Sequence, residues 1–121
     1  MKIKIGDIFY ENHGIATFYQ VVKVYDSGRV RIREIESELG KKISSYEFEA
    51  MPIINKFKAK EELSKTDAYS RDIKDNDKGT IKVVNYFDDG TPFLDLKGTY
   101  SYASLWDGKP VVSSYWYVWM K

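Results

Sequence analysis

The chain has 121 residues, of which 19 are Lys or Arg and 18 are Asp or Glu, so its formal net charge is +1. This length predicts one domain over 1–121, large enough to bury a hydrophobic core. The absence of cysteine excludes disulfides, thiolate metal sites and a cysteine nucleophile. The balanced charge excludes a strong overall field, so an anionic partner would have to be attracted by a local patch.

The N-terminal sequence MKIKIGDIFY lacks the apolar run and the small-residue cleavage site of a signal peptide. No stretch of the chain approaches the roughly 18 apolar residues of a membrane-spanning helix. We therefore expect a cytoplasmic protein with no membrane partner.

Three short strands are predicted near the start of the chain, where apolar and polar residues alternate. They cover 6–11, 17–25 and 29–36, and the last two are rich in β-branched and aromatic residues. The sequence Asp-Ser-Gly at 26–28 predicts a tight hairpin loop between these two strands, with Gly28 in a left-handed conformation.

Four more strands are predicted at 44–54, 80–87, 91–96 and 111–119. Because Pro52 has no backbone N–H to donate, its strand is expected at an edge or an end of the sheet. The sequence Asp-Asp-Gly at 88–90 predicts a second hairpin, in which the aspartates serve the turn.

Two segments depart from the strand pattern. Residues 55–79 are polar and charged and are expected to form an excursion, in which 58–65 fits a helix of two turns. Residues 100–106 space their large side chains by three and four, with Ser101 as a helix N-cap, which predicts a second short helix. The fold class is therefore mainly β: a small, strongly bent barrel or half-barrel, SH3-like among other forms, with one or two short helices.

The first hairpin has a predicted register in which Tyr25 lies opposite Arg29. Four apolar residues then face the core: Val22, Val24, Val30 and Ile32. The other face carries Tyr19, Val21, Lys23 and Tyr25, across from Arg33, Arg31 and Arg29. Because Lys23 then lies directly opposite Arg31, a like-charge pair that costs on the order of half a kcal/mol, the pattern indicates an anionic partner.

Basic side chains interleaved with tyrosines on a sheet face suit a nucleic acid, because stacking and phosphate contacts come from one surface. The alternative is that carboxylates of adjoining strands neutralise the arginines. The candidates are Glu34, Glu36, Glu47 and Glu49.

The C-terminal sequence is crowded with aromatic residues. Trp116, Val118 and Met120 would share one face of the last strand and fill the core. The opposite stripe, Tyr115, Tyr117 and Trp119, is either further core or a contact surface of the kind found at binding hot spots. In the preceding WDGKP sequence, Trp106 is expected to plug the barrel and Gly108 to form a tight turn.

Residues that could support catalysis or metal binding are few. His13 is the single histidine and sits in a polar turn without an evident nucleophile or metal partner. Asp72, Asp75 and Asp77 are close in sequence but lack the glycine and glutamate of a calcium loop. No nucleophile elbow, phosphate loop or zinc-ligand spacing occurs. We expect no catalytic residue, no metal and no cofactor.

The segments KIKIGDIFYENHG, TFYQVVKV and VRIREIE, together with SYASLWDGKPVVSSYWY, resemble a group of small proteins from bacteriophages and other mobile elements. These begin with a KVGDI-x-Y…FYQV pattern and end with SYA…WDGKPV. The chain departs from the pattern between Gly14 and Thr17, where it is shorter. The resemblance implies a phage-type origin, and hence the cytoplasm of a bacterial host, but no particular chemistry.

These observations favour a non-enzymatic accessory protein that binds a host macromolecule. A host protein bound through Tyr115, Tyr117 and Trp119 is the first expectation, with counter-defence of the anti-CRISPR type as one form of it. The alternative is a nucleic-acid-binding barrel that uses the basic hairpin face. The pattern does not predict an oligomeric state.

Overall fold

The computed structural model describes residues 2–13, 15–59, 79–96 and 102–114. These residues form eight strands and no helix. The strands are Ile8–His13 (β1), Ile15–Val24 (β2), Arg29–Lys42 (β3), Glu47–Phe57 (β4), Thr80–Tyr86 (β5), Pro92–Asp95 (β6), Tyr102–Leu105 (β7) and Val111–Ser114 (β8). Accordingly, no helix long and apolar enough to cross a membrane occurs in the described part of the chain.

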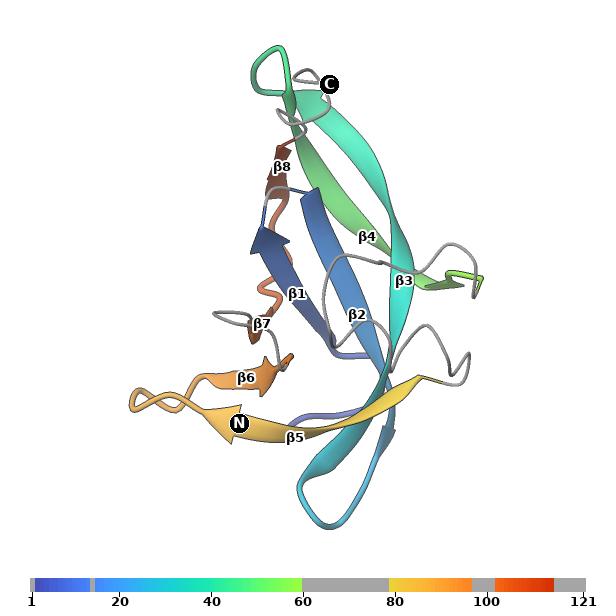
Figure 1. Cartoon of the computed structure of the whole chain (residues 1–121), viewed down its shortest axis with the longest axis vertical. Coiled ribbons are helices and arrows are strands. Elements are labelled where there is room, and N and C mark those ends of the chain that lie inside the picture. The colour runs from blue at the N-terminus through green and yellow to red at the C-terminus, as the bar shows by residue number, and fades with distance from the viewer. Residues whose placement is uncertain (1, 14, 60–78, 97–101, 115–121) are drawn as a thin grey trace.

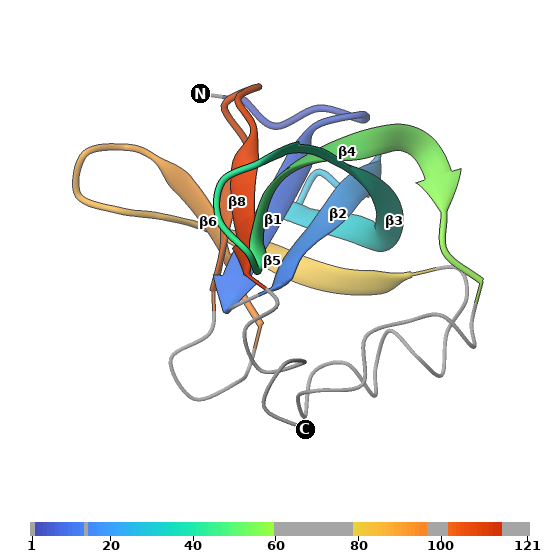
Figure 2. The same ribbon diagram turned by 90° about the horizontal axis from the view of Figure 1, so that it is seen from above.

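Six strands close into a ring of antiparallel hydrogen-bonded pairs, in the order β1-β2-β3-β5-β6-β7 and back to β1. The other two strands extend the sheet outside this ring, because β4 pairs with the second half of β3 and β8 pairs with β4. Figure 1 shows β3 and β4 rising together above the ring, and Figure 2 shows the ring strands curling around the barrel interior. The predicted small bent β-barrel is confirmed.

Two hydrophobic clusters use opposite faces of β1 and β2. The first fills the barrel and contains Ile3, Phe9, Tyr19, Val21, Val30, Ile32, Leu94, Leu96 and Ala103. The second lies outside the ring, under β4 and β8, and contains Ile8, Ala16, Phe18, Ile35, Ala50 and Val111. Because successive residues of a strand point to opposite faces, neighbours such as Ile8 and Phe9 enter different clusters.

The two predicted hairpin loops have the same construction. At 26–28, the N–H of Tyr25 donates to the carbonyl of Arg29, and Gly28 has a φ of 83°. At 88–90, the N–H of Phe87 donates to the carbonyl of Thr91, and Gly90 has a φ of 88°. A three-residue loop that ends in a left-handed glycine joins two antiparallel strands with the twist they require, so both predictions are confirmed.

At Pro52, β4 is the edge strand of the sheet, as predicted. Pro52 pairs with Ser37 of β3 on one side, whereas β8 reaches only Glu47–Ala50 on the other. On the side away from β3, no described strand lies opposite Pro52 to receive a hydrogen bond from its backbone.

The predicted register of the first hairpin is only partly correct. Val24 lies opposite Val30 and Lys23 opposite Arg31, but a β-bulge then pairs Val21, instead of Val22, with Ile32. The extra residue reverses the alternation of β2 beyond this point. Tyr19 and Val21 consequently enter the barrel, Val22 is half-buried, and Val24, near the loop, is exposed; Val30 and Ile32 are buried as predicted.

The predicted helix over 100–106 is wrong, because Tyr102–Leu105 forms β7 between β6 and β1. The spacing of its large residues fits either a helix or a strand. As a strand, the segment gains hydrogen bonds to β6 and β1, which a helix of under two turns lacks. Of the other predicted helix, Lys58 and Ala59 are described and are not helical; 60–65 lie outside the described residues. The last predicted strand is described over Val111–Ser114.

Trp106 does not plug the barrel. It follows Leu105, which packs against the barrel core, so its own side chain points to the outer surface. There its ring meets Phe18 edge-on, at 6.4 Å between centroids, and its Nε1 donates to the carbonyl of Lys109. Gly108 forms the turn with a φ of 89°, as expected.

Candidate nucleic-acid interface

The outer surface of the first hairpin carries four cationic side chains. Arg29, Arg31 and Arg33 alternate along β3 with the buried Val30 and Ile32, and they therefore point away from the barrel. Alternate residues of a strand are about 6.6 Å apart, so the three guanidinium groups begin as an evenly spaced row. Lys23 joins them from β2, opposite Arg31. We call Lys23, Tyr25, Arg29, Arg31 and Arg33 the basic face.

Tyr25 relieves the repulsion between Lys23 and Arg31. Its hydroxyl accepts a hydrogen bond from Nε of Arg31 at 3.2 Å, and Nζ of Lys23 lies 5.0 Å from its ring centroid. Both contacts place a cation against an electron-rich part of the tyrosine. The Nη groups of Arg31 form no hydrogen bond within the described residues, which leaves them available to a phosphate.

Arg33 lies over an aromatic ring at the other end of the row. Its guanidinium carbon lies 4.2 Å from the ring centroid of Phe57, the last residue of β4. Beside it, Gln20 and Asn55 form two hydrogen bonds, of 2.8 and 2.7 Å, that join β2 to β4. A guanidinium is also a planar group on which a nucleobase can stack.

The carboxylates that might have neutralised the arginines do not pair with them in the part of the chain that the structure describes. Glu34 points into the barrel and pairs with Lys58, and Glu36 pairs with Lys56 at 3.7 Å. Glu47 accepts a hydrogen bond from the hydroxyl of Ser44. Glu49 lies on β4, opposite Val112 of β8. Within the described residues, no carboxylate forms an ion pair with the four cations of the basic face.

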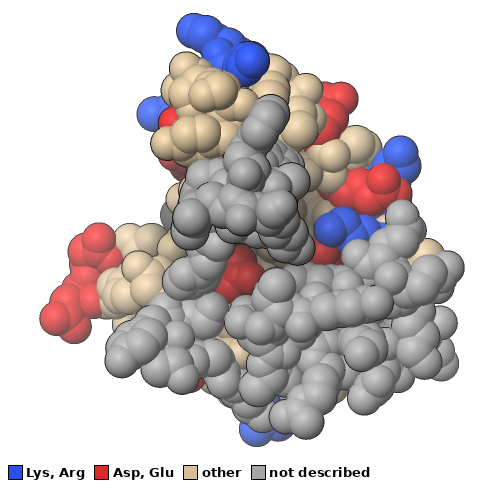
Figure 3. Space-filling model, turned by 45° about the horizontal axis from the view of Figure 1, so that its top comes forward, with Lys and Arg blue, Asp and Glu red and all other residues tan. Residues whose placement is uncertain are grey.

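The face of the molecule that Figure 3 shows has no single dominant charge among its described residues. Figure 3 shows lysine and arginine side chains in several separate groups with acidic groups between them. This distribution agrees with the near-zero net charge, so the attraction for a polyanion is confined to a local surface such as the basic face.

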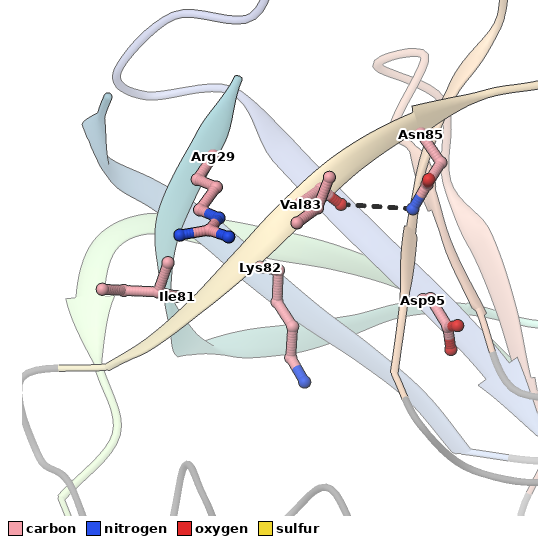
Figure 4. A pocket seen from close by; sticks show the side chains of 6 residues that line it. All are labelled: Arg29, Ile81, Lys82, Val83, Asn85 and Asp95. Carbon is pink, nitrogen blue, oxygen red and sulfur yellow. Dashed lines mark hydrogen bonds between the residues drawn. The ribbon is translucent and has the colours of Figure 1, made fainter. Parts of the chain in front are cut away.

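A pocket of about 510 Å³ adjoins the basic face along β5. It is lined by Arg29, Ile81, Lys82, Val83, Asn85 and Asp95. Figure 4 shows Arg29 and Ile81 at one end of this pocket and Asn85 and Asp95 at the other, with the Asn85 amide donating to the carbonyl of Val83. The basic face therefore continues, through Arg29, into a surface that carries apolar groups, the Asn85 amide and the charged side chains of Lys82 and Asp95.

The structure separates the residues predicted for nucleic-acid binding. It brings Lys23, Tyr25, Arg29 and Arg31 together on one face, with Arg33 beside them on Phe57. Tyr19 is not on this face, because the bulge in β2 turns it into the barrel, where it is fully buried.

Several residues predicted to form other sites lie outside the part of the chain that the structure describes. Tyr115, Tyr117 and Trp119 lie outside the described residues, as do Asp72, Asp75 and Asp77. Host-protein binding through the C-terminal stripe therefore stays a prediction. His13 is the last residue of β1, opposite Ile15. The described part of the chain holds no group of three side chains suited to a metal ion.

Sequence reasoning missed Phe57 and the β5 side of the surface. Phe57 falls in the segment read as a polar excursion, and it belongs to β4 because that strand continues past Asn55, whose φ is 68°. The signal that could have found it is the large apolar side chain of Phe57 itself, which lies only three residues after the apolar pair Ile53 and Ile54. Comparisons of the chain with protein-family models, with curated proteins and with solved structures find no match.

Proposed function

We propose that the protein binds single-stranded nucleic acid through its basic face. One observation carries the proposal: four cations lie together on the outer surface of β2 and β3 without a carboxylate partner among the described residues. Opposed like charges destabilise a sheet, and a bound phosphate chain would remove the part of that cost that Tyr25 does not relieve. The row of arginines along β3 suits an extended strand better than a compact anion.

The neighbouring groups support a single strand over a duplex. The arginine planes and Tyr25 are flat groups beside the phosphate-binding cations, and bases can stack on such groups only when they are unpaired. The pocket beside Arg29 adds apolar surface and the Asn85 amide, which a base can contact as well.

The test is fluorescence anisotropy with labelled 20-nucleotide single-stranded DNA and RNA over a range of salt concentrations. The double variant Arg29→Gln and Arg31→Gln should lose at least about tenfold in affinity, as expected when two phosphate contacts are removed. The slope of log affinity against log salt should fall in magnitude by about 1.4, because each phosphate contact to a single strand contributes roughly 0.7.

A matched control is available on the same strand. Lys41 and Lys42 are exposed at the far end of β3, and changing both to Gln removes the same charge from a different place. This control should retain most of the affinity. Equal losses in the two double variants, or a wild-type protein that does not bind at about 100 μM, would refute the proposal, because even non-specific binders reach this range.

A further inference from the structure

Three aromatic rings pack together on the outer surface at the β5–β6 hairpin. Phe87 and Phe93 stack with their centroids 4.2 Å apart and their planes 21° apart. Tyr102 of β7 meets both rings edge-on, at 5.5 Å from Phe87 and 5.9 Å from Phe93. The three residues thus form a single rigid cluster contributed by three segments.

The barrel does not bury this cluster. Leu94 and Ala103, the immediate neighbours of Phe93 and Tyr102, point inward and fill the core. Tyr102 remains 49% exposed and Phe87 remains 39% exposed. Large exposed aromatic groups that the core does not require are typical of contact surfaces.

Two carboxylates flank the cluster. Asp88 and Asp89 occupy the loop that follows Phe87, and both are exposed and form no ion pair within the described residues. Hydrogen bonds from Thr91 lower the pKa of Asp89, so this group is ionised at neutral pH. In Figure 3 the projecting β5–β6 hairpin, at the left, ends in acidic atoms with uncharged atoms behind them.

We propose that Phe87, Asp88, Asp89, Phe93 and Tyr102, the aromatic–acidic surface, dock a cationic segment of a protein partner. An arginine or lysine side chain of that segment lies on an exposed ring, where the quadrupole of the ring attracts its charge, and the loop carboxylates attract it further. A nucleic acid is the wrong occupant, because Asp88 and Asp89 would repel its phosphates. This surface is therefore separate in charge and in place from the basic face and does not depend on the function proposed for that face.

The test uses the full chain, labelled with ¹⁵N, and a hexa-arginine peptide as the probe, with hexa-glutamate as the comparison peptide. The hexa-arginine peptide should shift the amide signals of the β5–β6 hairpin and β7, and hexa-glutamate should not. Tyr102→Ser should weaken hexa-arginine binding by at least about fivefold. Asp88→Asn with Asp89→Asn should weaken it by about threefold and reduce its salt dependence.

Tyr46→Ser is the matched control, because Tyr46 is also an exposed tyrosine but lies in the loop before β4. It should leave binding unchanged. If Tyr102→Ser fails to fold, the Asp88 and Asp89 double variant decides the question alone. Shifts that map to another acidic region, equal affinities of wild type and both variants, or self-association of the wild type through this surface in sedimentation would overturn the proposal. The last result would assign the surface to a second copy of the chain.

Discussion

The side chains of Tyr25 and Arg31 hold each other in place on the basic face, with Nε of Arg31 donating to the Tyr25 hydroxyl at 3.2 Å. Tyr25 lies next to the loop and Arg31 lies on β3, so this bond ties the two strands of the hairpin together outside the backbone ladder. It also fixes the orientation of the Arg31 guanidinium, whose other N–H groups would contact a phosphate in the proposed function.

Tyr25→Phe should therefore weaken binding of single-stranded nucleic acid by about two- to fivefold, because Arg31 loses its orientation while the ring is kept. The free energy of unfolding should change by no more than about 1 kcal/mol, the worth of one partly buried hydrogen bond. Anisotropy titrations and urea denaturation measure the two quantities. A Tyr25→Phe variant that binds as well as wild type would show that the orientation of Arg31 does not matter.

Tyr19 and Lys23, both predicted for one surface, should respond differently to truncation. Tyr19→Ala removes a fully buried ring and should destabilise the fold by about 3 kcal/mol or more. Lys23→Ala removes an exposed side chain and should change stability by no more than about 0.5 kcal/mol while weakening nucleic-acid binding. Chemical denaturation checks both values. Similar stabilities of the two variants would contradict the bulge that turns Tyr19 inward.

The two ion pairs that link β3 to β4 and to Lys58 just after it should differ in their importance for stability. Glu34 is buried and its partner Lys58 is 28% exposed, whereas Lys56 and Glu36 form a more exposed pair. Lys58→Met should destabilise the fold by about 2 kcal/mol, below the roughly 3–5 kcal/mol of a fully buried pair because water reaches Lys58.

Lys56→Met is the control for this prediction, and it should change stability by no more than about 0.5 kcal/mol. Thermal and urea unfolding of the two variants under the same conditions provide the comparison. If Lys56→Met costs as much as Lys58→Met, the burial of Glu34 is not what makes the second pair important.

The carboxyl group of Asp89 should titrate below its ordinary pKa of 3.8, chiefly because the side chain of Thr91 donates to it and secondly because the Thr91 N–H does so at 2.9 Å. A lowered pKa in the folded state means that ionised Asp89 stabilises the hairpin above pH 3.8 and that this contribution is lost as the pH falls through the lowered pKa.

Thr91→Val removes the side-chain donor and keeps the backbone donor, so the Asp89 pKa should rise only part of the way toward its ordinary value. Carboxyl ¹³C chemical shifts followed between about pH 2 and 7 measure this pKa directly. An unchanged pKa in Thr91→Val would show that the backbone N–H accounts for the whole shift.

The sequence alone determined the features of this protein that depend on neighbouring residues. The loops at 26–28 and 88–90 end in Gly28 and Gly90, and the requirement for a positive φ is a matter of local sterics, so both hairpins could be read directly. Strand alternation and the missing N–H of Pro52 are local in the same sense. They predicted most strands and the outward direction of Arg29, Arg31 and Arg33.

The tertiary structure decided whatever depends on contacts between distant segments. The bulge between Val21 and Lys23 of β2 moves Tyr19 from the predicted surface into the barrel. Residues 102–105 became a strand because β1 and β6 provide hydrogen bonds on both sides. Glu34 pairs with Lys58 and Glu36 pairs with Lys56, both more than 15 residues away in the chain. Because these carboxylates are paired with lysines, the arginines of β3 have no carboxylate partner among the described residues. The alternation of residues along a strand predicts which face a side chain lies on. Its partner on that face depends on which other strands pack against the same face. Those strands come together only when the ring closes, and no single segment of the sequence encodes that closure.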